Sequence, residues 1–120
     1  MRKLLLAIVL SVSMQPGASR AEFGDGNHML KACVASIAAI ESRDSNPVLA
    51  GQCLGFVHAA KSILAFWEYD ETGYVCIPES VSNGQVIRVY VKWLNEHPER
   101  LHELDALLFI TAMQESFPCE

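Results

Sequence analysis

The chain has 120 residues, of which 51% are hydrophobic, and its 9 basic and 14 acidic side chains give a net charge of −5 at neutral pH. Nucleic acid is a poor partner for an acidic surface, because the phosphate backbone repels it. The length fits a single domain.

The first residues have the pattern of a secretory signal. Arg2 and Lys3 precede an apolar run at residues 4–12, and Ser19 and Ala21 are small residues that suit a cleavage site. The run is shorter than the roughly 20 apolar residues of a transmembrane helix. No later stretch of that length lacks charges, so we expect a soluble, exported protein without a stable membrane anchor.

This interpretation divides the chain into a signal peptide, residues 1–21, and one domain, residues 22–120. Cleavage would remove 3 of the 9 basic side chains and none of the 14 acidic ones, so the net charge would fall from −5 to −8. Opposite charge steers protein association, so a basic protein would suit this domain as a partner.

The domain begins with a predicted helix. Asp25 or Asn27 can cap it, and apolar residues recur at spacings of three and four through residues 30–40. Polar turn formers at residues 42–46 end it, and the residue before Pro47 is biased away from helical angles. The glycines that flank Asp25 predict a flexible lead-in to the helix.

A second predicted helix begins near Pro47, a favoured first-turn residue, and its apolar stripe continues to Trp67. Gly51 and Gly55 lower its helix propensity but would let a neighbouring helix come close. Residues 68–73 lose the period and are acidic, which predicts an exposed loop.

Two further helices complete the domain. Ser82 and Gln85 form a capping box, and the apolar stripe that follows to Leu94 predicts a helix, although its β-branched residues make a strand the competing interpretation. Pro98 fits the first turn of a final helix, whose stripe continues to Glu115.

Four cysteines remain after the signal. An even number in an exported chain predicts disulfides, but spacing alone allows three pairings. A zinc site is the rival interpretation, and it is disfavoured because structural zinc sites use close cysteine pairs. Antiparallel helices of similar length return the chain to its starting level, which predicts the pairs Cys33–Cys53 and Cys76–Cys119. The expected fold is all-α, a small orthogonal or antiparallel bundle of about four helices in two αα-hairpins stapled by two disulfides.

No catalytic set emerges from the sequence. His97 and His102 are five residues apart across a proline, not the i, i+4 pair that binds zinc from one helical face, and we expect both to be solvated. We expect His58 to be a partly buried, hydrogen-bonded residue with a structural role. Bridged cysteines have no thiolate to act as a nucleophile. We therefore expect no catalytic residue, no metal and no cofactor, and a protein that is not an enzyme.

The best candidate for a binding surface is the acidic loop with its flanking aromatic residues. Aromatic side chains beside charge are typical of interface hot spots. The D-x-D-x-D-G spacing of a calcium loop is absent. The predicted partner-binding residues are Trp67, Glu68, Tyr69, Asp70, Glu71 and Tyr74.

Short segments spread in order along nearly the whole domain resemble the Rap/Tai immunity proteins of type VI secretion systems. Each segment alone is weak, but the set is fairly specific because it includes all four cysteines and a terminal F-P-C. The segments are residues 26–30 (GNHML), 53–57 (CLGFV), 76–79 (CIPE), 84–86 (GQV), 93–99 (WLNEHPE) and 117–119 (FPC), together with Cys33.

The resemblance implies a periplasmic helical protein, commonly a homodimer, that neutralises a peptidoglycan-cleaving amidase effector by occluding its active site. It does not carry over the contact surface, because specificity lies in variable loops. An orphan or housekeeping role without an effector remains open. A second hypothesis is a periplasmic stress chaperone similar to the small acid-activated helical chaperones, which would expose apolar surface near pH 3 as carboxylates protonate.

Overall fold

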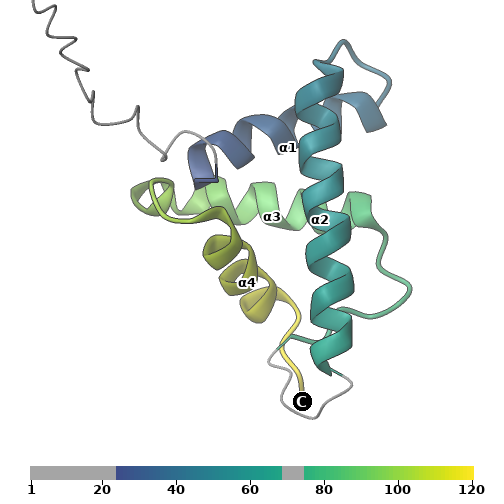
Figure 1. Cartoon of the computed structure of the whole chain (residues 1–120), viewed down its shortest axis with the longest axis vertical. Coiled ribbons are helices and arrows are strands. Elements are labelled where there is room, and N and C mark those ends of the chain that lie inside the picture. The colour runs from purple at the N-terminus through teal and green to yellow at the C-terminus, as the bar shows by residue number, and fades with distance from the viewer. Residues whose placement is uncertain (1–23, 69–74) are drawn as a thin grey trace, which may run out of the picture.

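The computed structural model describes residues 24–68 and 75–120, and Figure 1 shows their arrangement. These residues form helices without a strand, apart from two isolated bridges, Asp25 with Leu104 and Val75 with Pro118. The all-α prediction is confirmed for this part of the chain. The elements in order are α1 (Gly26–Ile40), α2 (Pro47–Glu68), α3 (Asn83–Glu96), a short 3-10 helix η1 (Pro98–Arg100) and α4 (Asp105–Ser116).

The start of α1 is fixed by one of the two predicted caps. The Asp25 carboxylate accepts a hydrogen bond of 2.8 Å from the backbone N–H of His28, which satisfies one of the helix's free first-turn donors. The Asn27 side chain instead donates to the carbonyl of Leu101 at 3.0 Å. Asp25 is therefore the N-cap, and Asn27 ties α1 to a distant segment.

Gly26 lies at a close approach between α1 and the segment before α4. The residue is buried, and its N–H donates to the carbonyl of Glu103 at 3.1 Å. A Cβ at this position would lie 2.5 Å from Cδ1 of Leu108 and 2.9 Å from the carbonyl oxygen of Leu101. The predicted flexible lead-in is thus wrong for Gly26, which is needed because no side chain fits between the two backbones.

The other predicted helix starts are confirmed where local side chains set them. The Asn46 side chain accepts hydrogen bonds of 3.0 and 3.2 Å from the N–H groups of Val48 and Leu49, so α2 begins at Pro47 with a side-chain cap. Both halves of the capping box are present at Ser82 and Gln85. The competing strand interpretation of residues 83–94 is wrong, because α3 covers them.

The last helix begins later than the sequence predicts. Pro98 starts η1, and α4 begins only at Asp105. The reason is a set of backbone hydrogen bonds to the start of α1: the N–H of Asp105 donates to Gly24 at 2.8 Å, and Glu103 accepts from Gly26. These bonds hold Leu104 in an extended conformation, with φ −59° and ψ 128°, which interrupts the helix.

Both predicted disulfides are confirmed. Cys33 in α1 bonds to Cys53 in α2, and Cys76 before α3 bonds to Cys119 after α4, each with the two Cα atoms 5.0 Å apart. The first bond is fully buried. The chain is therefore closed into two consecutive loops, one around each helix pair.

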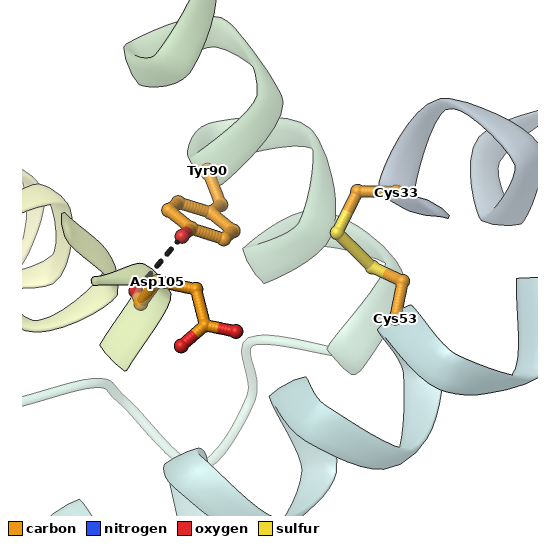
Figure 2. Close-up of a disulfide and its surroundings, with 4 residues drawn as sticks. All are labelled: Cys33, Cys53, Tyr90 and Asp105. Carbon is orange, nitrogen blue, oxygen red and sulfur yellow. Dashed lines mark hydrogen bonds between the residues drawn. A yellow bond between two sulfur atoms is a disulfide. The ribbon is translucent and has the colours of Figure 1, made fainter. Parts of the chain in front are cut away.

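Helix α3 forms the centre of the core. It contacts α1, α2 and α4, and α2 crosses it in Figure 1. Figure 2 shows the Tyr90 hydroxyl pointing toward the start of α4, where it donates to the carbonyl of Asp105 at 3.0 Å. The Tyr90 ring packs edge-on against Phe109, with ring centroids 5.1 Å apart. The buried residues of α3 are Val86, Ile87, Tyr90, Trp93 and Leu94.

One described stretch, Pro47–Phe66 within α2, is long and apolar enough to cross a membrane by length and composition alone. In this fold the same stretch carries Cys53, which is bonded to α1, and Lys61, which donates a hydrogen bond to the carbonyl of Val81. Only 22% of its most apolar window is buried inside the domain. Much of α2 is therefore exposed apolar surface.

Candidate partner-binding surface

The structure does not test the predicted partner-binding loop. Trp67 and Glu68 are the last two residues of α2, but the structure does not describe their side chains. Tyr69, Asp70, Glu71 and Tyr74 lie outside the described residues. The loop stays a prediction.

His102 is exposed, as predicted, but two other histidines are placed differently from expectation. His97 is half-buried rather than solvated: its ring stacks on Trp93, with centroids 4.0 Å apart, and its Nδ1 lies 2.8 Å from the Trp93 carbonyl oxygen. His58 is exposed rather than partly buried, and its ring nitrogen lies 3.3 Å from the side-chain nitrogen of Asn83. Residues 24–68 and 75–120 contain no group of three His, Cys, Asp or Glu side chains that could hold a metal ion.

The motif at residues 93–99 connects α3 to η1 and contacts α4 through Trp93. Trp93 donates from its indole nitrogen to the carboxylate of Glu115 at 2.7 Å, and the Arg100 guanidinium carbon lies 5.2 Å from the centre of its ring. Arg100 also makes two hydrogen bonds of 2.8 Å to Glu103, which hold the pKa of that carboxyl below its ordinary value. These contacts give the motif a structural role.

Between α2 and α4 lies an apolar groove with a volume of about 300 Å³. All of its lining side chains are aliphatic or aromatic, so it offers no hydrogen-bonding side chain. It opens to solvent, and Ile63 on its edge is 52% exposed. The lining residues are Phe56, Ala59, Ala60, Ile63 and Leu64 from α2, and Ala106, Phe109 and Ile110 from α4.

The sequence pattern does not predict this groove. The pattern assigns the apolar stripe of each helix to the core, and it contains no information on how the helices are placed relative to one another. The available signal was the extra width of the stripe at Leu107 and Ile110 in α4. A helix whose apolar band is wider than its buried face leaves part of that band at the surface.

The outer face of α2 extends this apolar surface. A Cβ added at Gly51 or Gly55 would meet nothing within 4 Å, so the predicted close approach of a neighbouring helix does not occur within the described chain. Val48 and Phe66, near the two ends of the helix, are 68% and 74% exposed. None of the exposed residues of α2 with described side chains carries a formal charge; besides Pro47 they are Val48, Gly51, Gln52, Leu54, Gly55, His58, Ala59, Ser62, Ile63, Ala65 and Phe66.

Charge depletion is the compositional mark of an interface core. Exposed apolar patches of this kind mark sites of association with other molecules. The fold and this surface define the class: a small, disulfide-closed helical domain with an exposed, uncharged face on one helix.

A model of the Rap1a immunity protein family matches residues 25–119. The chain belongs to the Rap1a immunity protein family, which confirms the resemblance to the Rap/Tai proteins and indicates an immunity role. Comparisons with curated proteins and with solved structures gave no significant match.

Proposed function

We propose that the protein is a periplasmic immunity protein that binds a cognate peptidoglycan amidase effector of a type VI secretion system and occludes its active site. The observation that carries this proposal is the family match across residues 25–119, which spans both disulfides and all the described helices. Immunity proteins act by binding a toxin, and they generally catalyse no reaction of their own.

The disulfides support an oxidising location. Disulfides persist in the periplasm and other oxidising compartments and are rare in the cytosol. All four cysteines are paired. We propose that residues 1–21 are the signal peptide that directs export, and that residues 22–120 are the functional domain.

The charge and the exposed surface support a protein as partner. The exported domain would carry a net charge of −8, which favours a basic target. We propose that the acidic loop, Trp67, Glu68, Tyr69, Asp70, Glu71 and Tyr74, contributes to this contact, since aromatic residues beside charge are enriched at interfaces. We also propose that the protein forms a homodimer, as the family resemblance implies.

The proposal predicts that the purified domain stops peptidoglycan cleavage by one amidase. Residues 22–120 would be mixed at equal molar amounts with each type VI amidase encoded in the same genome, and cleavage of purified peptidoglycan would be measured. One amidase should lose nearly all activity while the others, as matched controls, keep theirs. The mass of the complex by light scattering gives the number of copies bound.

Deletion of the gene should make the strain sensitive to the same amidase delivered by its siblings, and restoring the gene should protect it. The amidase proposal fails if the domain inhibits none of the encoded amidases and the deletion strain tolerates all of them.

A further inference from the structure

The groove between α2 and α4 has the properties of an anchor pocket. Its walls come from the two disulfide-closed halves of the fold: α2 is held by Cys33–Cys53, and the end of α4 is held by Cys76–Cys119. Each bond limits the motion of its own wall, and both helices pack against α3. Such a pocket is preorganised, so a ligand loses little affinity to ordering it.

The chemistry of the walls selects an apolar occupant. Phe56 and Phe109 form the inner part of the groove, with ring centroids 5.4 Å apart in an edge-to-face contact. No lining side chain can donate or accept a hydrogen bond, so a polar group that entered would lose its contacts with water without replacement. A volume of about 300 Å³ is at the lower limit for a small-molecule site and suits one or two apolar side chains.

The surroundings of the groove indicate that the occupant belongs to a larger molecule. Phe66 of α2 is 74% exposed and Leu107 of α4 is 50% exposed, and neither lines the groove, so both helices carry exposed apolar surface beyond it. A ligand small enough to fit the groove alone would leave these side chains in water. A protein that inserts a side chain would cover them as well, which is the usual arrangement of a hot spot and its surroundings.

The charge of the surroundings favours a protein over an anionic lipid as the occupant of the groove. Helix α4 contains no basic residue, and the only lysine of α2, Lys61, donates to the carbonyl of Val81. Asp105 lies beside the lining residue Ala106 at one end of the groove. Anionic headgroups would therefore meet an acidic chain with no basic side chain on either wall to hold them, whereas a basic protein surface would be attracted.

From these observations we infer that the α2–α4 groove receives an apolar side chain of the target protein, and that basic residues surround that side chain on the target. This inference rests on the proposed function, because it names the surface through which the inhibitor holds its target. It adds a second contact region to the acidic loop that follows α2.

The test measures the affinity of variants for the amidase that the wild-type domain inhibits. Ala59→Phe and Ala106→Phe fill the groove from opposite walls, and each should weaken binding at least about tenfold, as loss of a hot spot does. Ala39→Phe is the matched control, because Ala39 is exposed on α1, away from the groove, and should leave affinity unchanged. Circular dichroism and thermal unfolding verify that each variant is folded.

Two further variants test the charge of the target without changing the core. Ile63→Lys and Ile63→Glu place opposite charges on a half-exposed side chain at the edge of the groove. Both should weaken binding, and the lysine should weaken it several-fold more if the target is basic around the inserted side chain. A glutamate that weakens binding more than the lysine would contradict the inferred charge of the target.

Three outcomes distinguish a failure of the groove inference from a failure of the proposed function. If the filled variants bind the amidase as tightly as the wild type, the groove inference is wrong while the immunity function stands. If the wild type inhibits none of the amidases, the proposed function fails and the groove loses its target. Binding of the wild type to phosphatidylglycerol vesicles that Ala59→Phe and Ala106→Phe abolish would assign the groove to lipid and overturn the inference.

Discussion

Tyr90 shows how a single polar atom is accommodated in this core. The residue is fully buried, and its hydroxyl donates to Asp105. Burial raises the pKa of the phenol well above its ordinary value of 10.0, and the negative charge of Asp105 raises it further. The folded protein therefore holds the phenol proton more tightly than the unfolded chain does.

Replacing Tyr90 with phenylalanine should reduce stability by about 0.5–1.5 kcal/mol, the usual net contribution of one hydrogen bond. The ring can keep its packing against Phe109, so the loss should not reach the cost of a cavity. Urea unfolding at neutral pH under non-reducing conditions measures this difference. A loss above about 3 kcal/mol would show that the ring had moved.

The same variant has a distinct pH dependence. Since the folded pKa is raised, the contribution of Tyr90 is complete below pH 10 and is lost as the pH rises above it, where the unfolded chain releases its proton first. The wild type should lose stability over that range, and Tyr90→Phe should lose less. Parallel curves for the two proteins would contradict this assignment.

At the scale of elements, the sequence predicted the boundaries that local side chains set. The Ser82 capping box and the start at Pro47 depend on residues within three positions of the helix end, so the sequence displays them directly. The start of α4 depends on the hydrogen bond from Asp105 to Gly24, a residue far away in the chain. A pattern within one helix contains no information on such a bond.

The two candidate binding surfaces also differ in how far the sequence predicts them. The acidic loop was a compositional prediction and stays one. The groove depends on the distance between α2 and α4, two helices joined through α3, so it became visible only in three dimensions. The width of the apolar band around Ile110 indicated surplus apolar surface but not its location.

The junction between α1 and the segment before α4 gives a test at this scale. Gly26→Ala should destabilise the protein by about 1–3 kcal/mol, because overpacking forces two backbones apart. The new Cβ would lie 2.9 Å from the carbonyl oxygen and 3.0 Å from the Cα of Leu101, and backbone atoms cannot rotate away. Gly84→Ala is the matched control, since its nearest atoms would lie 3.5 Å away and alanine favours the helix.

Chemical denaturation compares the two alanine variants. Equal stability of Gly26→Ala and the wild type would mean that α1 and Leu101 can separate at little cost. The contact would then not fix the start of α4.

At the scale of the whole molecule, two cross-links supply a large share of the stability. The bonds span 20 and 43 residues in sequence. By loop-closure entropy they contribute about 3 and about 4 kcal/mol, against a typical net stability of 5–15 kcal/mol. Cross-linking therefore helps to stabilise a small helical domain that leaves one apolar helix partly exposed.

The double variant Cys76→Ser with Cys119→Ser should lose about 4 kcal/mol of stability. Both cysteines are partly exposed, so the serine hydroxyls can reach water and the loss reports mainly the missing cross-link. Urea unfolding of the variant beside the wild type measures it, and the wild type after selective reduction of this bond is the control. A loss below about 1 kcal/mol would show that packing, and not the Cys76–Cys119 bond, stabilises the second half of the chain.

The pairing order of the cysteines also affects how the protein is made. Each cysteine bonds to the next one along the chain, Cys33 to Cys53 and then Cys76 to Cys119. A polypeptide that emerges from a translocation channel with its amino terminus first presents these thiols in the same order. If the chain is exported as proposed, oxidising each thiol with its successor gives the native bonds, and we expect its maturation to need an oxidant but no disulfide isomerase.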